Sequence, residues 1–201
     1  LQQLNNWIAL VHSTAGAPIT AALKRACLKL FRAVPIYALF ADAATDSSPP
    51  GMGGFCHGFY WYFTIPAYAL KWLHITALEL LATCFNIIMF ADHLNAKARA
   101  VFHTDALATP YTLAEESASS PILNYILRRC MQSHFFTRVA AFAEITHCSG
   151  DSNEVADSIS RSLLDRFHAL CLQLQIQPVE LILRSELPII FDDVLAFAAS
   201  R

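Results

Sequence analysis

The chain has 201 residues, a formal net charge of −2 and an apolar composition, with 55% hydrophobic and 15% charged residues. This length supports one sizeable hydrophobic core, and the small net charge excludes recognition of nucleic acid by bulk charge alone, so such a partner must be recognised locally. The apolar excess, together with a first residue that is Leu1 rather than Met, leads us to expect a segment of a larger protein whose neighbours cover part of its surface.

No membrane segment, secretory signal or cysteine framework is predicted. The longest stretch without Asp, Glu, Lys or Arg is 47–70, and it contains three prolines and four glycines, which a membrane-spanning helix would not tolerate. Residues 1–13 lack the basic flank and apolar run of a secretory signal. The six cysteines form no CxxC pair, so we expect reduced thiols and an intracellular location, in the cytoplasm or nucleus.

Residues 1–35 are predicted to form a helical connector. In "ITAALKRACLKLFRAV" the apolar residues recur at helical spacing, and Pro35 follows as a stop signal. Three basic residues share another face of this helix: Arg25, Lys29 and Arg32. They are interpreted either as a solvated surface or as contacts to a phosphate backbone.

The next part of the chain is rich in strand signals. "IYALFADAAT" is a short apolar run, and "GMGGFCHGFYWYFTI" predicts two strands joined by a tight turn. One buried helix is predicted over 75–93 and a strand over 98–106.

The second half alternates further helices and strands. Helix starts are predicted at Thr112, three residues before Glu115, and at Ser120, which precedes a proline. A strand is predicted over 138–147, followed by a helix after Asn153 and by helical segments broken near Pro178 and Pro188. This order predicts an α/β fold with a mixed sheet flanked by helices and with helical N- and C-terminal extensions.

Four acidic residues stand in apolar surroundings at the ends of predicted elements: Asp42, Glu79, Asp105 and Asp157. An isolated buried charge costs several kcal/mol, whereas carboxylates that converge can share divalent cations. Oxygen ligands favour Mg²⁺ or Mn²⁺, and two such ions form the arrangement used for phosphodiester cleavage. Asp46 competes with Asp42 as the first acid, and Asp42 is preferred because it directly follows the apolar run.

The acids and their surrounding stretches resemble the ribonuclease H superfamily. The matching stretches are "FADAATDSSPPGMGGF", "ITALELLA", "FHTDALA" and "HCSGDSNEVADSISR". The last is similar to the closing motif of retroelement ribonuclease H domains, with matches at His147, Gly150, Asn153, Asp157 and Arg161. These sequence stretches are most similar to reverse-transcriptase polyproteins of retrotransposons, in particular the DIRS-like type.

This resemblance implies a metal-dependent endonuclease, a hydrolase that cleaves the RNA strand of RNA–DNA hybrids. Its ribonuclease H-like domain would span 36–161, between the connector 1–35 and a helical extension 162–201. Asp42, Glu79, Asp105 and Asp157 would hold two Mg²⁺ ions, for which Mn²⁺ can substitute, and His147 would act as a mobile proton carrier or aid product release. The partners would be the hybrid and an adjacent polymerase domain of the same polyprotein.

The chain departs from the family pattern in its basic residues. It has no basic, Trp-rich substrate-binding segment, so hybrid binding is assigned to the polymerase or to Arg25, Lys29, Arg32, Arg128 and Arg129. The pair in "LRRC" is otherwise explained as complementing a helix C-terminus. Two alternatives stay open: a catalytically inactive ribonuclease H-like scaffold that supports a polymerase, and a transposase or integrase of the same superfamily.

Overall fold

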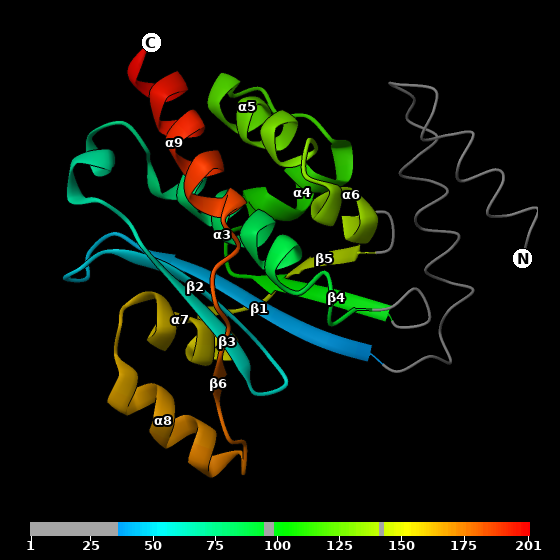
Figure 1. Cartoon of the computed structure of the whole chain (residues 1–201), viewed down its shortest axis with the longest axis vertical. Coiled ribbons are helices and arrows are strands. Elements are labelled where there is room, and N and C mark those ends of the chain that lie inside the picture. Colours follow the sequence, from blue (N-terminus) through cyan, green and yellow to red (C-terminus); the bar gives the residue numbers. More distant parts are fainter. Residues whose placement is uncertain (1–35, 95–98, 141–142) are drawn as a thin grey trace, which may run out of the picture.

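A six-stranded mixed sheet forms the centre of the protein (Figure 1). The structure is a computed structural model that describes residues 36–94, 99–140 and 143–201, so the predicted connector with Arg25, Lys29 and Arg32 lies outside the described residues. The strand order is β5-β4-β1-β2-β3-β6, in which β1, β2 and β3 are antiparallel and the other pairs are parallel. The strands are β1 (Ile36–Ala44), β2 (Gly51–Cys56), β3 (Phe59–Thr64), β4 (Arg99–Thr104), β5 (Ala143–His147) and β6 (Val179–Glu180). The predicted α/β class with a mixed sheet is confirmed.

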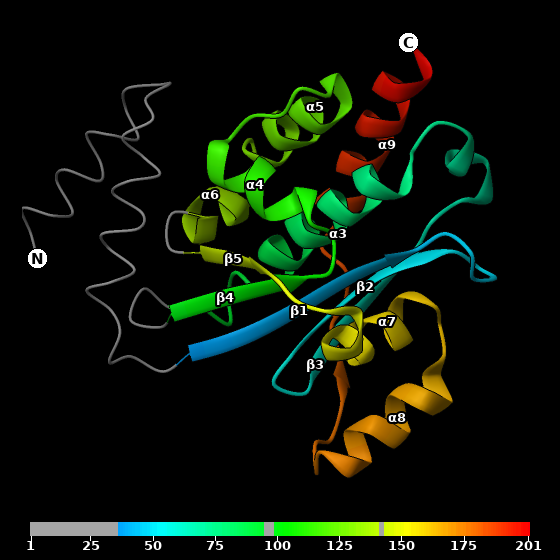
Figure 2. The ribbon, with the colours of Figure 1, turned by 180° about the vertical axis from the view of Figure 1, so that it is seen from behind.

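Helices cover both faces of this sheet. They are η1 (Ala67–Lys71), α3 (Ile75–Met89), α4 (Ala108–Glu115), α5 (Pro121–Cys130), α6 (His134–Ala140), η2 (Gly150–Asn153), α7 (Glu154–Ser160), α8 (Leu164–Gln173) and α9 (Glu186–Ala199). Helices α3 to α6 and α9 lie on one face, and α7 and α8 lie on the other (Figures 1 and 2). None of the helices in the described part of the chain combines the length and apolar character needed to cross a bilayer.

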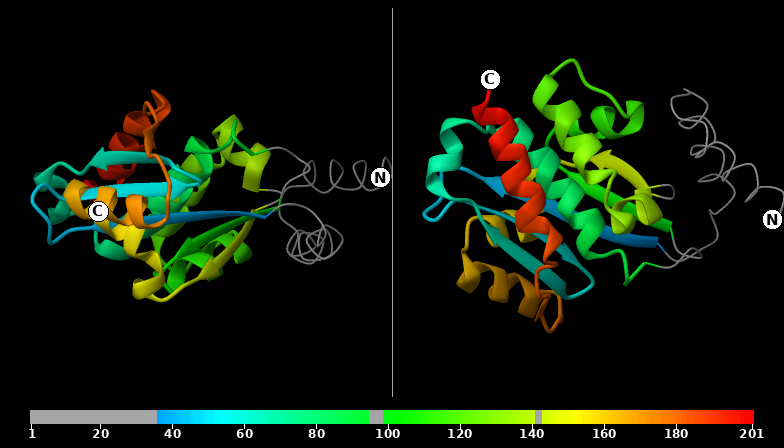
Figure 3. Two further views of the ribbon diagram at one scale, coloured as in Figure 1. Left: turned by 90° about the horizontal axis from the view of Figure 1, so that it is seen from below. Right: turned by 45° about the horizontal axis from the view of Figure 1, so that its top comes forward.

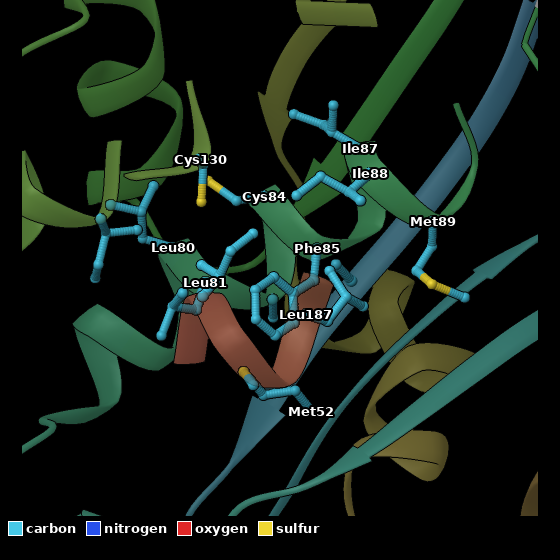
Figure 4. Packing of buried hydrophobic residues seen from close by; sticks show 14 of the residues in the cluster. Met52, Leu80, Leu81, Cys84, Phe85, Ile87, Ile88, Met89, Cys130 and Leu187 are labelled. Carbon is cyan, nitrogen blue, oxygen red and sulfur yellow. The ribbon is translucent and has the colours of Figure 1, made fainter. Parts of the chain in front are cut away.

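Helix α3 is the centre of the larger hydrophobic core. Every residue from Ala77 to Met89 is buried, which explains why apolar residues occur on all sides of this segment rather than on one face. Side chains from other elements meet it there, including Met52 of β2, Cys130 of α5 and Leu187 of α9 (Figure 4). A buried hydrogen bond joins β3 to α3: the indole Nε1 of Trp61 donates to Asn86 Oδ1 at 2.8 Å.

Glycines in β2 allow helices to approach both faces of the sheet closely. A Cβ atom at Gly53 would lie 2.4 Å from Cγ2 of Ile159 in α7, and one at Gly54 would lie 2.1 Å from Oδ1 of Asn86 in α3. Successive strand residues face opposite sides, so these two glycines serve α7 and α3 respectively. The glycines of β2 thus allow α7 to pack close to the sheet. Helix α7 carries several residues of the site described below.

Replacing Gly53 with alanine is expected to destabilise the fold by about 1–3 kcal/mol, because the added methyl group overpacks the contact with Ile159. Urea unfolding monitored by tryptophan fluorescence measures this change. Gly150→Ala is the control, since a Cβ there meets no atom closer than 4.0 Å. Equal stability of the two variants would contradict the close packing of α7 against β2.

Several predicted elements are confirmed with shifted ends. The predicted tight turn joins β2 and β3, and His57 and Gly58 adopt φ values of 47° and 92° there, as this type of hairpin turn requires. The helix predicted over 75–93 ends at Met89, and the strand predicted over 98–106 spans Arg99–Thr104. Helix α5 begins at Pro121 as predicted.

The strand predicted over 138–147 is wrong in its first half. Helix α6 occupies His134–Ala140, and only Ala143–His147 forms β5. The buried residues Phe136 and Val139 are three positions apart, which is a helical spacing, and the hydroxyl of Ser133 accepts a hydrogen bond from the Phe136 N–H at 3.4 Å. The apolar residues that follow suggested a strand, although Ser133 caps the start of a helix.

Two predicted boundaries that involve helix signals are also wrong. No helix starts at Thr112, because α4 already begins at Ala108 and includes that residue. No helix breaks at Pro188, which lies in the first turn of α9, where a proline costs no intrahelical hydrogen bond. The short strand β6 was not predicted.

The segment 162–201, predicted as a C-terminal extension, packs against the preceding part of the chain. Strand β6 pairs with β3, and α9 buries Leu187, Ile190, Phe191 and Val194 in the same core as α3. Helix α9 also lies beside α5, where the rings of Tyr125 and Phe197 stack with their centroids 4.1 Å apart. Helix α8 lies apart from this group, on the opposite side of the sheet (Figure 3). The boundary at residue 161 itself stays a prediction.

Candidate metal centre

Three of the four predicted acids come together at one edge of the sheet. Asp42 lies near the end of β1, Glu79 in the second turn of α3, and Asp105 directly after β4. One carboxylate oxygen from each of the three lies within 4.8 Å of the other two. Asp42 and Glu79 are 4% and 7% exposed, whereas Asp105 is more accessible, so the group opens to solvent on the side of Asp105.

The pairing of β1 with β4 explains why two acids far apart in sequence are neighbours. These strands are parallel, and Phe40 is the partner of His103. Asp42 and Asp105 each follow two residues later, so they occupy matching positions on strands about 4.8 Å apart. Glu79 arrives from α3, and its Oε1 accepts a hydrogen bond from the Ala43 N–H at 3.3 Å.

Burial and mutual repulsion disfavour the charged forms of these carboxylates. Desolvation is the main reason that the pKa of Glu79 rises to about 9, with further contributions from Asp42 and Asp105. Desolvation also raises the pKa of Asp42 to about 7, against the effect of a hydrogen bond from Ser160, and it raises the pKa of Asp105. A cluster of this kind is costly to ionise unless a cation compensates its charge.

A second observation supports a cation at this place. Oε2 of Glu79 is buried and has no hydrogen-bond partner in the structure, although a buried carboxylate oxygen normally has one. Oδ1 of the buried Asn153, whose amide nitrogen contacts Asp42, likewise lacks a partner. Oxygen donors that are grouped and unsatisfied fit a hard divalent cation such as Mg²⁺ or Mn²⁺.

Helix α7 and the turn before it hold the carboxylate of Asp42. Nδ2 of Asn153 donates to Asp42 Oδ1 at 3.3 Å and to the Ala41 carbonyl oxygen at 3.1 Å. The hydroxyl of Ser160 donates to Asp42 Oδ2. Both oxygens of Asp42 are therefore oriented by residues more than a hundred positions later in the chain, which is the kind of outer-shell support that metal ligands require.

The fourth predicted acid, Asp157, is near the other three but forms ion pairs with two arginines. Its Oδ1 lies 2.6 Å from Nε of Arg161, and its Oδ2 lies 3.6 Å from a terminal nitrogen of Arg166. Its charge contributes to the raised pKa values of Asp42, Glu79 and Asp105, so the four acids share one electrostatic environment. Its role as a metal ligand stays a prediction.

The preference for Asp42 over Asp46 agrees with the geometry. Asp46 is exposed and forms an ion pair with Arg161 at 2.7 Å, outside the group of three acids. His147 is exposed at the end of β5, the strand next to β4, and Thr104 is its partner in the register. His147 therefore lies at the same sheet edge as Asp105.

Of the predicted substrate-binding residues, the structure describes Arg128 and Arg129. Arg129 forms an ion pair with Asp193 of α9 at 2.6 Å, and Arg128 is exposed at the end of α5. Arg25, Lys29 and Arg32 belong to the part of the chain that is not described. Their role in binding a substrate stays a prediction.

Ser160 contacts Asp42 in the site but was not predicted to do so. Serine at this place looks like an ordinary helix residue, and only its spacing after Asn153 and Asp157 on the same turn-helix segment indicates that it faces β1. Arg166 was missed for a similar reason, since it belongs to the next helix and reaches Asp157 through space.

Replacing Ser160 with alanine is expected to weaken Mn²⁺ binding about 10- to 100-fold, because Asp42 loses the donor that orients its Oδ2. Calorimetric titration with Mn²⁺ measures the change. Ser158→Ala is a matched control, because Ser158 is buried in the same helix but donates to the Glu154 carbonyl oxygen. An equal loss in both variants would mean that Ser160 only stabilises α7.

Comparisons with known proteins do not assign a family. No protein-family model matches the chain, and no curated protein sequence matches it. The fold and the site define the protein as an α/β protein with a mixed six-stranded sheet, flanking helices and a buried group of three acids that could hold a metal ion.

Proposed function

We propose that this chain is the ribonuclease H-like part of a retroelement reverse-transcriptase polyprotein and hydrolyses the RNA strand of RNA–DNA hybrids with Mg²⁺ or Mn²⁺. The observation that carries the proposal is the approach of Asp42, Glu79 and Asp105 within 4.8 Å, with Oε2 of Glu79 buried and unpartnered. This arrangement is intelligible if a divalent cation belongs there, and a pair of such cations serves phosphodiester hydrolysis.

The order of the acids and the fold support this choice among metal-dependent functions. The acids follow the order Asp, Glu, Asp, Asp: in strand β1, in helix α3, directly after strand β4 and in helix α7, in a mixed sheet with helices on both faces. The resemblance of the sequence stretches to the ribonuclease H superfamily implies this order and this class of fold. Function cannot be taken from fold alone, so the acids are the stronger argument.

Each residue has a defined task in the proposed site. Asp42, Glu79 and Asp105 would hold the first cation, and Asp157 together with Asp42 would hold the second. When bound, such cations lower the pKa of a coordinated water and stabilise charge on the phosphate. Asn153 and Ser160 orient Asp42, and His147, exposed at the rim, would exchange a proton with solvent or product.

Substrate choice tests the proposal directly. The chain is incubated with end-labelled RNA–DNA hybrid, duplex DNA and single-stranded RNA, each with Mg²⁺, Mn²⁺ or a chelator. We expect metal-dependent cuts in the RNA strand of the hybrid alone, because 2′-hydroxyl contacts distinguish RNA from DNA. Cleavage of duplex DNA instead would favour a transposase or integrase.

One observation favours a second candidate, a scaffold without catalytic activity. Arg161 and Arg166 form ion pairs with Asp157. This pairing is expected in a site that no longer binds two metal ions. Such a scaffold would bind hybrid or support the adjacent polymerase domain of the polyprotein. It would leave all three nucleic acids intact under every metal condition.

A further inference from the structure

Arg161 forms ion pairs with two acidic residues at once, Asp157 of α7 and Asp46 in the connection between β1 and β2. It follows the last residue of α7, and its side chain is 34% exposed. Its Nε donates to Asp157 at 2.6 Å, and its NH1 donates to Asp46 at 2.7 Å. One guanidinium thus bridges the late helix and the connection between β1 and β2.

This guanidinium is within electrostatic reach of the candidate metal centre. It follows Ser160, whose hydroxyl binds Asp42, and its positive charge acts to lower the pKa values of Asp42 and Asp105. Asp157, with which it pairs, acts on the same two carboxyls in the opposite direction. Arg161 therefore compensates part of the negative charge of the cluster in this state of the protein.

The two oxygens of Asp157 are not equally free to bind a cation. Oδ1 accepts the short, charge-assisted hydrogen bond from Arg161, and Oδ2 faces Arg166 at 3.6 Å. The hydrogen bonds that Asp42 and Glu79 accept come from Ala43, Asn153 and Ser160, none of which carries a positive charge. The two parts of the site therefore differ: Oε2 of Glu79 has no hydrogen-bond partner, whereas Asp157 is already paired with an arginine.

We infer that Arg161 acts as an internal substitute for the second cation. The group of three acids takes one divalent ion directly. A second ion binds through Asp157 only when the guanidinium moves away from it, and Asp46, which NH1 already contacts, keeps the guanidinium paired. This inference rests on the proposed function, because it assumes that the cluster binds divalent cations. Arg161 is a positioning residue here, since it acts through Asp157.

The number and affinity of bound Mn²⁺ ions test the inference without reference to activity. Mn²⁺ alone is titrated into the intact chain by calorimetry, and the free ion is counted by electron paramagnetic resonance. We expect one ion bound tightly and a second bound weakly in the wild-type protein. In Arg161→Gln the second ion should bind about tenfold more tightly, because a like charge next to its site is lost.

Two further variants separate charge from packing. Arg161→Lys keeps the positive charge and should leave the second ion weak. Arg166→Gln removes a more distant charge whose shorter contact, at 2.8 Å, is with Glu154, so its effect should be clearly smaller. Thermal unfolding of each metal-free variant checks that the fold is retained, which is expected because exposed ion pairs contribute little to stability.

Each outcome decides between defined possibilities. A tighter second ion in Arg161→Gln but not in Arg161→Lys supports the inference. An unchanged or weaker second ion in Arg161→Gln, with the first ion still bound, overturns it and leaves the proposed function standing. If neither the wild type nor any variant binds Mn²⁺, the proposed function and this inference both fail.

Discussion

Hydrolysis of an RNA–DNA hybrid is expected to fall by more than about a hundredfold when Asp105 is replaced by asparagine. Asp105 offers one of the three grouped carboxylate oxygens and is the most accessible of the three acids, so it faces the side from which a substrate phosphate would approach. Loss of a residue that merely supports a metal ligand already costs about 10- to 100-fold, and loss of the ligand itself should cost more. Initial rates in Mg²⁺ and in Mn²⁺ measure the change.

The same variant must keep its fold for this result to be informative. Burial raises the pKa of Asp105, and so does its like-charged neighbour Asp157. Removing the charge should therefore leave the metal-free protein at least as stable as the wild type, as measured by thermal unfolding. Asp192→Asn, on the exposed part of α9, is the control and should cleave normally. Retained activity in Asp105→Asn would contradict the assignment of the site.

The stability of the metal-free protein is expected to fall by at least about 2 kcal/mol between pH 5 and pH 7. The pKa of Glu79 is about 9 in the folded protein against 4.5 as its ordinary value, and that of Asp42 is about 7 against 3.8. Both pKa values are raised, so the folded state binds more protons than the unfolded state. Stability is therefore full below the ordinary pKa values and falls as the pH rises from these to the folded pKa values, a range that includes pH 5 to pH 7.

Urea unfolding across this pH range measures the effect. Mg²⁺ or Mn²⁺ should restore stability above pH 7, because a ligand that binds only the folded state stabilises it. Glu79→Gln should flatten the pH dependence, make the metal-free protein more stable than wild type at pH 8, and remove the response to metal. If the stability of the wild type did not change with pH, the pKa values of the acids would not be raised in the folded state, and the argument for a bound cation would be weaker.

Local sequence signals were sufficient for the elements that build the site. The glycine-rich hairpin, the apolar run before Asp42 and the helix around Glu79 have short-range signatures, and each is present in the structure. The errors occurred where two local signals conflict. Residues 138–140 were included in a predicted strand, yet they end helix α6, which begins after the serine cap Ser133 and buries residues three positions apart. Pro188 reads as a stop signal but is accommodated in the first turn of α9.

The sequence by itself determined the class of fold and which acids were candidates, because burial patterns and element ends are encoded by neighbouring residues. Tertiary structure alone decided that Asp42, Glu79 and Asp105 meet within 4.8 Å, that Arg166 reaches Asp157 and that Arg161 pairs with Asp46. The physical reason is register: a parallel pairing of β1 with β4 places Asp42 beside Asp105, and a shift of one residue would turn one of them to the other face. Ion pairs across α7, α8 and the β1–β2 connection depend on helix packing, which no local pattern specifies.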